Sequence, residues 1–168
     1  PVATMLAAGS VHKPRMAPER RVQPRRRPTH GEDQVDFVST RIITADVRRL
    51  VAFYETVTGV KLTLYTEDFA ELVTEAGTLA IGSTRTLRLF GGDHVASPAA
   101  NRSAIVEFRV ADVDEEYRRL GGFIGGALVQ APTTMPWGNR SLLFRDPDGN
   151  LVNFFTPVTA EAIAKFER

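Results

Sequence analysis

The chain carries one short pattern twice, and this repeat constrains its fold more than any other feature. A strand-like run, Phe37 to Thr44, leads into Asp46-Val47 and a segment with apolar residues at helical spacing. A second run, Ala104 to Val110, leads in the same way into Asp112-Val113 and another helical segment. The two Asp-Val pairs lie 112 − 46 = 66 positions apart. Because aspartate is a favoured N-cap residue, we expect each helix to begin directly after its aspartate.

Each predicted helix is followed by glycine and then by three short extended runs. The order is therefore βαβββ, repeated, and the fold class is α+β with two tandem modules that bury apolar faces against each other. The expected runs are Leu62 to Thr66, Phe69 to Thr74 and Thr78 to Ser83 in the first copy, and Ala127 to Val129, Ser141 to Arg145 and Leu151 to Phe155 in the second.

The stretch PWGNRSLLFRDPDGNLVNFF, from Pro136 to Phe155, predicts a β-hairpin. Pro147 presets the first central dihedral of its turn, and Gly149 takes the left-handed position. This hairpin and the segment DVRRLVAFYETVTGV resemble the glyoxalase / bleomycin-resistance / extradiol-dioxygenase group, the vicinal oxygen chelate superfamily. The resemblance covers roughly residues 35–157. It implies one cleft-shaped, barrel-like sheet with the helices outside.

Three parts are expected along the chain. Residues 1–34 are rich in Pro and Arg, lack any helical or strand period, and are predicted to form a disordered basic arm. Three interpretations of this arm are open. It binds nucleic acid or an anionic membrane weakly, it is a solvated extension without a role, or it is an artefact of an upstream start site. Residues 35–157 form the vicinal oxygen chelate domain, with modules at about 35–92 and 102–157. Residues 158–168 form a C-terminal helix packed on the outside.

The resemblance also implies where a metal would bind. Metal-dependent relatives use four cleft-facing ligands, usually His, Gln or Glu, from the first and last strands of each module. The matching positions hold Ser39, Ile105 and Asn153, with Ile81 or Arg88 at the fourth. Isoleucine and arginine cannot supply the donors that a divalent ion needs. We therefore expect a metal-free protein with no cofactor.

The remaining chemistry agrees with this expectation. The chain has no cysteine, which excludes disulfides, thiolate metal sites and thiol nucleophiles and fits a reducing interior. Two of its three histidines, His12 and His30, fall in the arm, and His94 falls between the modules.

No apolar run approaches the roughly 20 residues of a membrane span. We expect a cytoplasmic homodimer that binds a small molecule, with no membrane partner and with nucleic acid contacted only through the arm.

Strand alternation sorts the faces of the predicted sheets. Val106, Phe108 and Val110 form an apolar set that faces the helices, so Glu107 and its alternate neighbours point into the cleft. The same offset of 66 makes Arg41 the equivalent of Glu107 in the first module, so it also points into the cleft. The predicted ligand-binding residues are Ser39, Arg41, Ile105, Glu107, Trp137 and Asn153.

Each of these side chains has more than one interpretation. Arg41 can hold an anion through its planar donor fork, and Glu107 can act as a base, or the two can pair as a structural ion pair. Trp137 can stack on a flat ligand or close a loop. Asn153 can bond a ligand or satisfy nearby backbone.

Two functions remain open at this stage. The first is a small-molecule-binding protein of the bleomycin-resistance type that lacks the usual metal ligands. The second is a glyoxalase-like lyase or isomerase, or a dioxygenase-related enzyme, with a non-standard metal or an acid/base site in which Glu107 is catalytic. The sequence does not decide between binding and catalysis.

Overall fold

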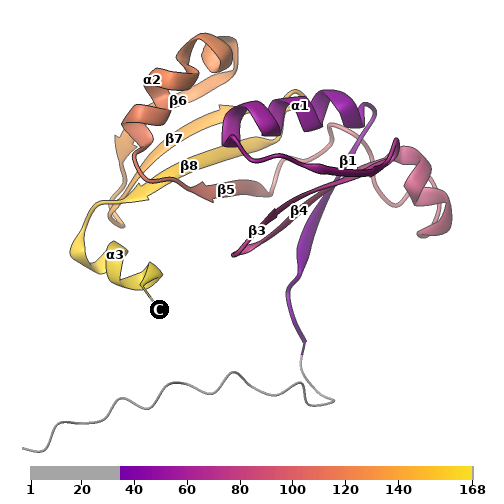
Figure 1. Ribbon diagram of the computed structural model, residues 1–168, viewed down its shortest axis with the longest axis horizontal. Coiled ribbons are helices and arrows are strands. Elements are labelled where there is room, and N and C mark those ends of the chain that lie inside the picture. Colours follow the sequence, from indigo (N-terminus) through magenta and orange to yellow (C-terminus); the bar gives the residue numbers. More distant parts are fainter. Residues whose placement is uncertain (1–34, 168) are drawn as a thin grey trace, which may run out of the picture. The chain divides into compact units, whose positions relative to one another are not determined.

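A computed structural model describes residues 35–167, and the predictions for residues 1–34 lie outside the described part. The predicted βαβββ repeat is confirmed (Figure 1). In chain order the elements are β1 (Ser39–Thr44), α1 (Val47–Thr58), β2 (Thr63–Thr66), β3 (Phe69–Thr74), β4 (Gly77–Ser83), the 3-10 helix η1 (Thr84–Leu89), β5 (Ile105–Arg109), α2 (Val113–Ile124), the 3-10 helix η2 (Gly125–Ala127), β6 (Leu128–Thr134), β7 (Asn139–Arg145), β8 (Leu151–Pro157) and α3 (Ala160–Phe166).

Each module contributes its own four-stranded mixed sheet. The strand orders are β1-β4-β3-β2 and β5-β8-β7-β6, so the second module repeats the topology of the first. The first strand of each module pairs in parallel with the last, and the remaining pairs are antiparallel. The α+β class is as predicted, but β1 and β5 each pair on one side alone. Within residues 35–167 the strands therefore form two sheets and no closed barrel.

Both helices begin where the sequence predicts. The Asp46 carboxylate accepts a hydrogen bond from the Arg49 N–H at 3.0 Å, which caps α1. The Asp112 carboxylate accepts from two backbone N–H groups of the first turn of α2. Gly59 ends α1 with φ of 70°, a conformation that costs glycine little. Each N-cap satisfies amides that would otherwise lack a partner.

One apolar core spans both modules. Phe53 of α1 packs on Phe144 of β7 at 6.3 Å between ring centroids, and the core draws buried residues from both sheets. The Arg119 guanidinium of α2 donates to the carbonyls of Thr56 and Val57 at 3.2 and 2.7 Å. These carbonyls end α1, where a cation is favourable. The two modules therefore fold against each other.

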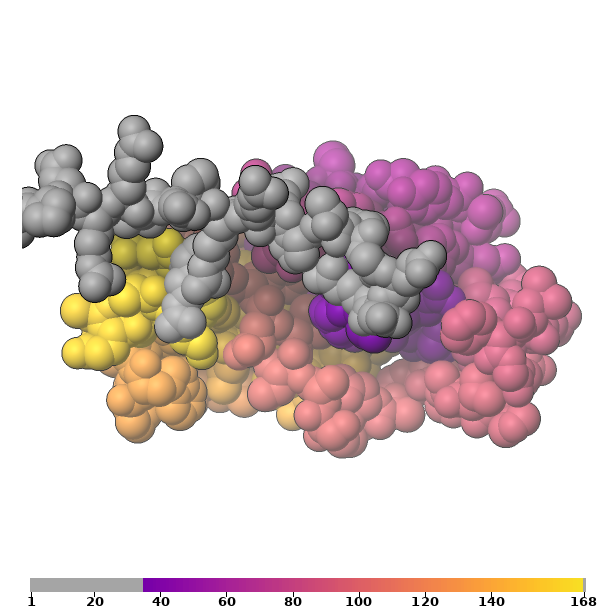
Figure 2. All heavy atoms as spheres, turned by 90° about the horizontal axis from the view of Figure 1, so that it is seen from below, coloured from indigo at the N-terminus to yellow at the C-terminus, as the bar shows by residue number. Residues whose placement is uncertain are grey.

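The C-terminal helix packs on one face of the second sheet. We call the side of the sheets that meets α1 and α2 the helix face, and the opposite side the cleft face. Phe166 of α3 packs on Phe155 at 5.5 Å, and the Arg109 guanidinium lies 5.5 Å from the same ring. Phe155 is buried on the cleft face, because it lies two residues after Asn153 on β8 and so points to the same side. Phe155 therefore offers α3 an apolar surface on the cleft face. Figures 1 and 2 show the C-terminal residues, in yellow, at one end of the molecule.

No helix within residues 35–167 is both long enough and apolar enough to cross a membrane.

Candidate functional site

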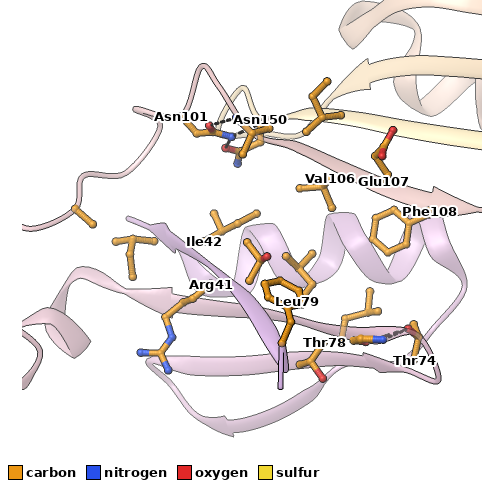
Figure 3. A pocket seen from close by; sticks show the side chains of 18 of the residues that line it. Arg41, Ile42, Thr74, Thr78, Leu79, Asn101, Val106, Glu107, Phe108 and Asn150 are labelled. Atoms are coloured by element: carbon orange, nitrogen blue, oxygen red, sulfur yellow. Dashed lines mark hydrogen bonds between the residues drawn. The ribbon is translucent and has the colours of Figure 1, made fainter. Parts of the chain in front are cut away.

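A cavity of about 510 Å³ lies along β1 and β5, each of which is an edge strand of its sheet (Figure 3). Residues 40–43 of β1 form one long wall, and residues 105–108 of β5 with the preceding Ala104 form the other. The β3–β4 hairpin and the linker between the modules complete the lining. Because the walls come from both modules, the cavity exists only when the two are packed together.

Apolar side chains from the helix face point into this cavity. Figure 3 shows Val106 and Phe108 on one side of β5 and the Glu107 carboxylate on the other. Ile42 and Leu79 approach from the first module, whereas the Arg41 guanidinium points away from them. The interior is therefore apolar, and the charged groups of the same strands lie on the cleft face.

The polar side chains at one end of the cavity are already bonded within the protein. Asn101 Nδ2 donates to Asn150 Oδ1 at 3.1 Å and to the Ala104 carbonyl at 3.0 Å. Asn101 Oδ1 accepts from two backbone N–H groups of the linker. The Asn150 Nδ2 donates to Asp146 at 2.7 Å. This end of the cavity is a fixed wall whose hydrogen bonds hold the linker and the closing turn together.

On the cleft face the structure brings two predicted site residues together. Asn153 Nδ2 donates to Glu107 Oε1 at 2.8 Å, since the two residues are register partners on β8 and β5. Asn153 is 8% exposed, and its Oδ1 has no hydrogen-bond partner in the described part of the chain. A buried acceptor without a partner is energetically unfavourable. The pair therefore orients the exposed Glu107 carboxylate and leaves acceptor capacity beside it.

Arg41 lies apart from this pair. Its guanidinium carbon sits 5.0 Å from the Phe69 ring centroid and 5.3 Å from that of Phe90. No salt bridge joins Arg41 to Glu107 in residues 35–167. The alternative of a structural ion pair between them is wrong, because Arg41 is exposed and the two rings of its own module hold it by cation–π contact.

The other predicted ligand-binding residues are more scattered. Ser39 is exposed on β1, and Ile105 is 51% exposed on β5. Trp137 is 67% exposed in the turn between β6 and β7 and lines neither cavity found in the described residues. Of the six predicted residues, Arg41, Ile105 and Glu107 border the cavity.

The fourth metal-ligand position requires a correction. Ile81 is fully buried in the core and pairs with Ile42 on the helix face. Arg88 lies in η1, outside any strand. The register pairs Arg41 with Ala80 just as it pairs Glu107 with Asn153, so Ala80 is the equivalent position. A methyl group supplies no metal ligand.

The donor set around these positions is small. No group of three or more His, Asp and Glu side chains within the described residues is arranged to hold a metal ion. One hydroxyl at Ser39 and one amide at Asn153 fall short of the four to eight donors that biological divalent ions take.

Sequence reasoning missed the cavity walls. It assigned Val106 and Phe108 to the face that meets the helices, which is correct, but it did not predict that they also line a cavity. The order of the strands in the repeat does indicate where a cavity can form. The first strand of a βαβββ module ends its sheet, so the first strands of two packed modules can face each other across a gap.

A family model described as the Glyoxalase/Bleomycin resistance protein/Dioxygenase superfamily matches residues 35–154. A comparison with curated proteins found no match.

Several solved structures share this fold. A glyoxalase/bleomycin resistance protein/dioxygenase from Nocardioides is 23% identical, with a TM-score of 0.61, over 76% of this chain and 86% of that one. A family enzyme from Burkholderia phytofirmans PsJN is 19% identical, with a TM-score of 0.64, over 74% and 100%. TioX from Micromonospora sp. ML1 is 27% identical, with a TM-score of 0.54, over 74% and 100%.

Proposed function

Because the chain belongs to the glyoxalase/bleomycin resistance protein/dioxygenase superfamily, we propose that it is a small-molecule-binding protein whose ligand occupies the cavity between β1 and β5. The cavity itself carries this proposal. Its volume of about 510 Å³ lies within the range of roughly 300 to 1,000 Å³ that is usual for ligand sites. Apolar walls with few polar groups favour a ligand held mainly by burial of its apolar surface.

The same proposal holds that binding does not depend on a metal. The family positions carry Ser39, Ala80, Ile105 and Asn153. These residues do not fit a divalent ion, because two of the four have no donor atom in the side chain. The ligand of this protein is therefore bound by direct contact with the chain.

The cleft-face residues extend the proposed site. Arg41 and Glu107 border the cavity and carry their charges at its cleft-face side, so a polar end of the ligand would meet them there. Ser39 and Ile105 lie beside them at the start of β1 and β5, and Asn153 supports Glu107. A contact from Trp137 stays a prediction.

A thermal-shift panel of aromatic antibiotics and small metabolites tests the proposal. Compounds that fill the cavity should raise the melting temperature, since they bind the folded state alone. Thr40→Phe, on β1 and lining the cavity, should abolish the shift by filling the space. Thr63→Phe is the matched control, because Thr63 is also exposed on an edge strand, β2, and lies outside the cavity lining. A panel that shifts neither protein at high concentration contradicts the proposal.

A second candidate function is acid/base catalysis, as a glyoxalase-like lyase or isomerase or a dioxygenase-related enzyme. One observation favours it, namely that Asn153 holds one oxygen of the Glu107 carboxylate at 2.8 Å and orients the other. A positioned carboxylate contributes about 10²- to 10⁴-fold in rate by proton transfer. Lyase, isomerase and dioxygenase assays on the wild type and on Glu107→Gln separate the candidates. Unchanged turnover in the variant excludes Glu107 as the base.

We extend the proposal to a homodimer in the cytoplasm. The absence of cysteine fits a reducing compartment, and relatives of this kind commonly pair. Analytical ultracentrifugation of the full chain tests the assembly, and a monomer at micromolar concentration contradicts it.

A further inference from the structure

We propose that the ligand of the cavity is an extended, peptide-like chain that pairs with the free edges of β1 and β5. This inference rests on the proposed function, because it assigns a chemical class to the ligand of the same cavity. The observation behind it is that the cavity runs along two strands that each lack a second neighbour.

The free edges supply unpaired main-chain groups. β1 pairs with β4 alone and β5 with β8 alone. In a strand with one neighbour, about half of the backbone N–H and C=O groups point away from that neighbour. None of the other backbone hydrogen bonds in residues 35–167 involves residues 39–44 or 105–109. Both edges therefore present donors and acceptors toward the gap.

Several polar side chains of the cavity are already bonded within the protein. Asn101 and Asn150 are committed to the linker and the closing turn. Thr74 is committed to Gly77, whose N–H and carbonyl it contacts at 3.3 and 2.9 Å. The cavity wall therefore offers the main chain of β1 and β5 beside the hydroxyls of Thr40, Thr78 and Ser97. Amides spaced along an extended chain are the groups that satisfy such an edge.

The two faces of the gap differ in a way that suits a strand. A strand inserted between β1 and β5 would direct alternate side chains to opposite faces. On the helix face these side chains would meet Ile42, Val106 and Phe108, which are apolar. On the cleft face they would meet Arg41 and Glu107, which are charged. The structure therefore favours a ligand with apolar groups at every second position and polar groups between them.

The lining also sets the length of the ligand. The walls consist of four residues of β1 and of four residues of β5 together with Ala104, which precedes that strand, at about 3.3 Å per residue. Four to five residues of an extended chain would span this length.

The probe is a blocked pentapeptide with valine at its first, third and fifth positions and serine between them. Its binding to the full chain is measured by calorimetry beside two N-methylated forms. One form is methylated at the odd amides and the other at the even amides. Successive N–H groups of a strand point to opposite edges, so each form removes the donors to one protein strand. Each form should bind roughly tenfold or more weakly than the parent peptide.

Hydrogen exchange on the protein gives the direct readout. The parent peptide should slow exchange of amides within both residues 39–44 and residues 105–109. When either N-methylated form is bound, the protein's amides should stay unprotected in one of these two segments. Equal affinity of all three peptides, or binding without protection in either segment, overturns the inference.

The result also separates this inference from the proposed function. If panel compounds without amides bind in a manner abolished by Thr40→Phe, while the peptide does not bind, the inference fails and the cavity keeps its proposed role. If neither peptide nor panel compound binds, both fail.

Discussion

The Tyr54 hydroxyl donates a hydrogen bond to Asp146 Oδ2 at 3.0 Å and so joins the helix of the first module to the closing turn of the second. Both residues are buried. Asp146 also accepts from the N–H groups of Asp148 and Asn150, at 2.9 and 2.8 Å. Burial raises the pKa of the Tyr54 phenol, and the Asp146 carboxylate raises it further, so the hydroxyl keeps its proton. The turn motif DPDGN is thus also a contact between modules.

Replacing Tyr54 with phenylalanine should lower the free energy of unfolding by about 1 to 3 kcal/mol, because it leaves Asp146 Oδ2 with one donor fewer in a buried site. Tyr117→Phe is the matched control, since the Tyr117 hydroxyl makes no hydrogen bond in the described residues. Urea denaturation of both variants measures the difference. An equal effect at the two positions contradicts the role given to the Tyr54 hydroxyl.

Arg49→Met should destabilise the fold, whereas Arg48→Met should not. Arg49 pairs with Asp148, whose side chain is 3% exposed, and its removal leaves a buried carboxylate without its cation. Since Arg49 itself is 51% exposed, the expected loss is about 1 to 2 kcal/mol. Arg48 pairs with Glu67 at 3.7 Å, and both side chains are well exposed.

Chemical denaturation of these two variants at neutral pH compares the pairs directly. The Arg48 variant should lie within about 0.5 kcal/mol of the wild type. Equal losses would show that Asp148 does not need its partner.

The ion pair of Asp114 and Arg140 should make stability depend on pH in the acid range. Arg140 donates to both carboxylate oxygens of Asp114, at 2.6 and 2.8 Å, and these hydrogen bonds hold the pKa of Asp114 below its ordinary value of 3.8. A depressed pKa stabilises the fold fully above the unfolded value, and this contribution disappears as the pH falls through the folded value. The stability difference between the wild type and Arg140→Gln should therefore shrink below about pH 4.

Urea denaturation of both proteins from about pH 6 to pH 2.5 follows this difference. Arg145→Gln serves as a control, because the Arg145 guanidinium donates to the Gly149 carbonyl rather than to a carboxylate in the described residues. A difference for Arg140→Gln that is flat with pH contradicts the assignment.

Purified protein should contain no stoichiometric metal. The positions of Ser39, Ala80, Ile105 and Asn153 offer too few donors for a stable site. Mass spectrometry of untagged protein, with calorimetric titration of Mn²⁺, Ni²⁺, Zn²⁺ and Fe²⁺, measures this. One tightly bound ion per chain would contradict the metal-independent proposal and direct attention to lyase, isomerase and dioxygenase assays.

The sequence predicts the elements of this fold well because their signals are local. Asp46 and Asp112 cap their helices through backbone amides two or three residues away. Gly149 adopts φ of 81° in the predicted turn. The strand alternation places Val106 and Phe108 against the core as expected.

The candidate site is predicted less completely, because its geometry depends on residues far apart in the chain. The offset of 66 makes Arg41 and Glu107 equivalent, but equivalence in a repeat does not imply contact. Arg41 turns to the rings of Phe69 and Phe90, and Glu107 bonds Asn153. The assignment of Ile81 or Arg88 to the fourth metal-ligand position failed for a related reason, since the register of β4 against β1 is set by pairing across the sheet.

The sequence by itself determined the two βαβββ modules, their caps and turns, and the faces of their strands, because each follows from backbone bonds and side-chain alternation within a few residues. Only the tertiary structure decided that β1 and β5 stand apart with a cavity between them, and that α3 covers Phe155 on the cleft face. The separation of the two sheets depends on how α1 packs against the second module, through contacts such as that of Tyr54 with Asp146, 92 positions apart. Contacts at that distance in the chain leave no local signal in the sequence.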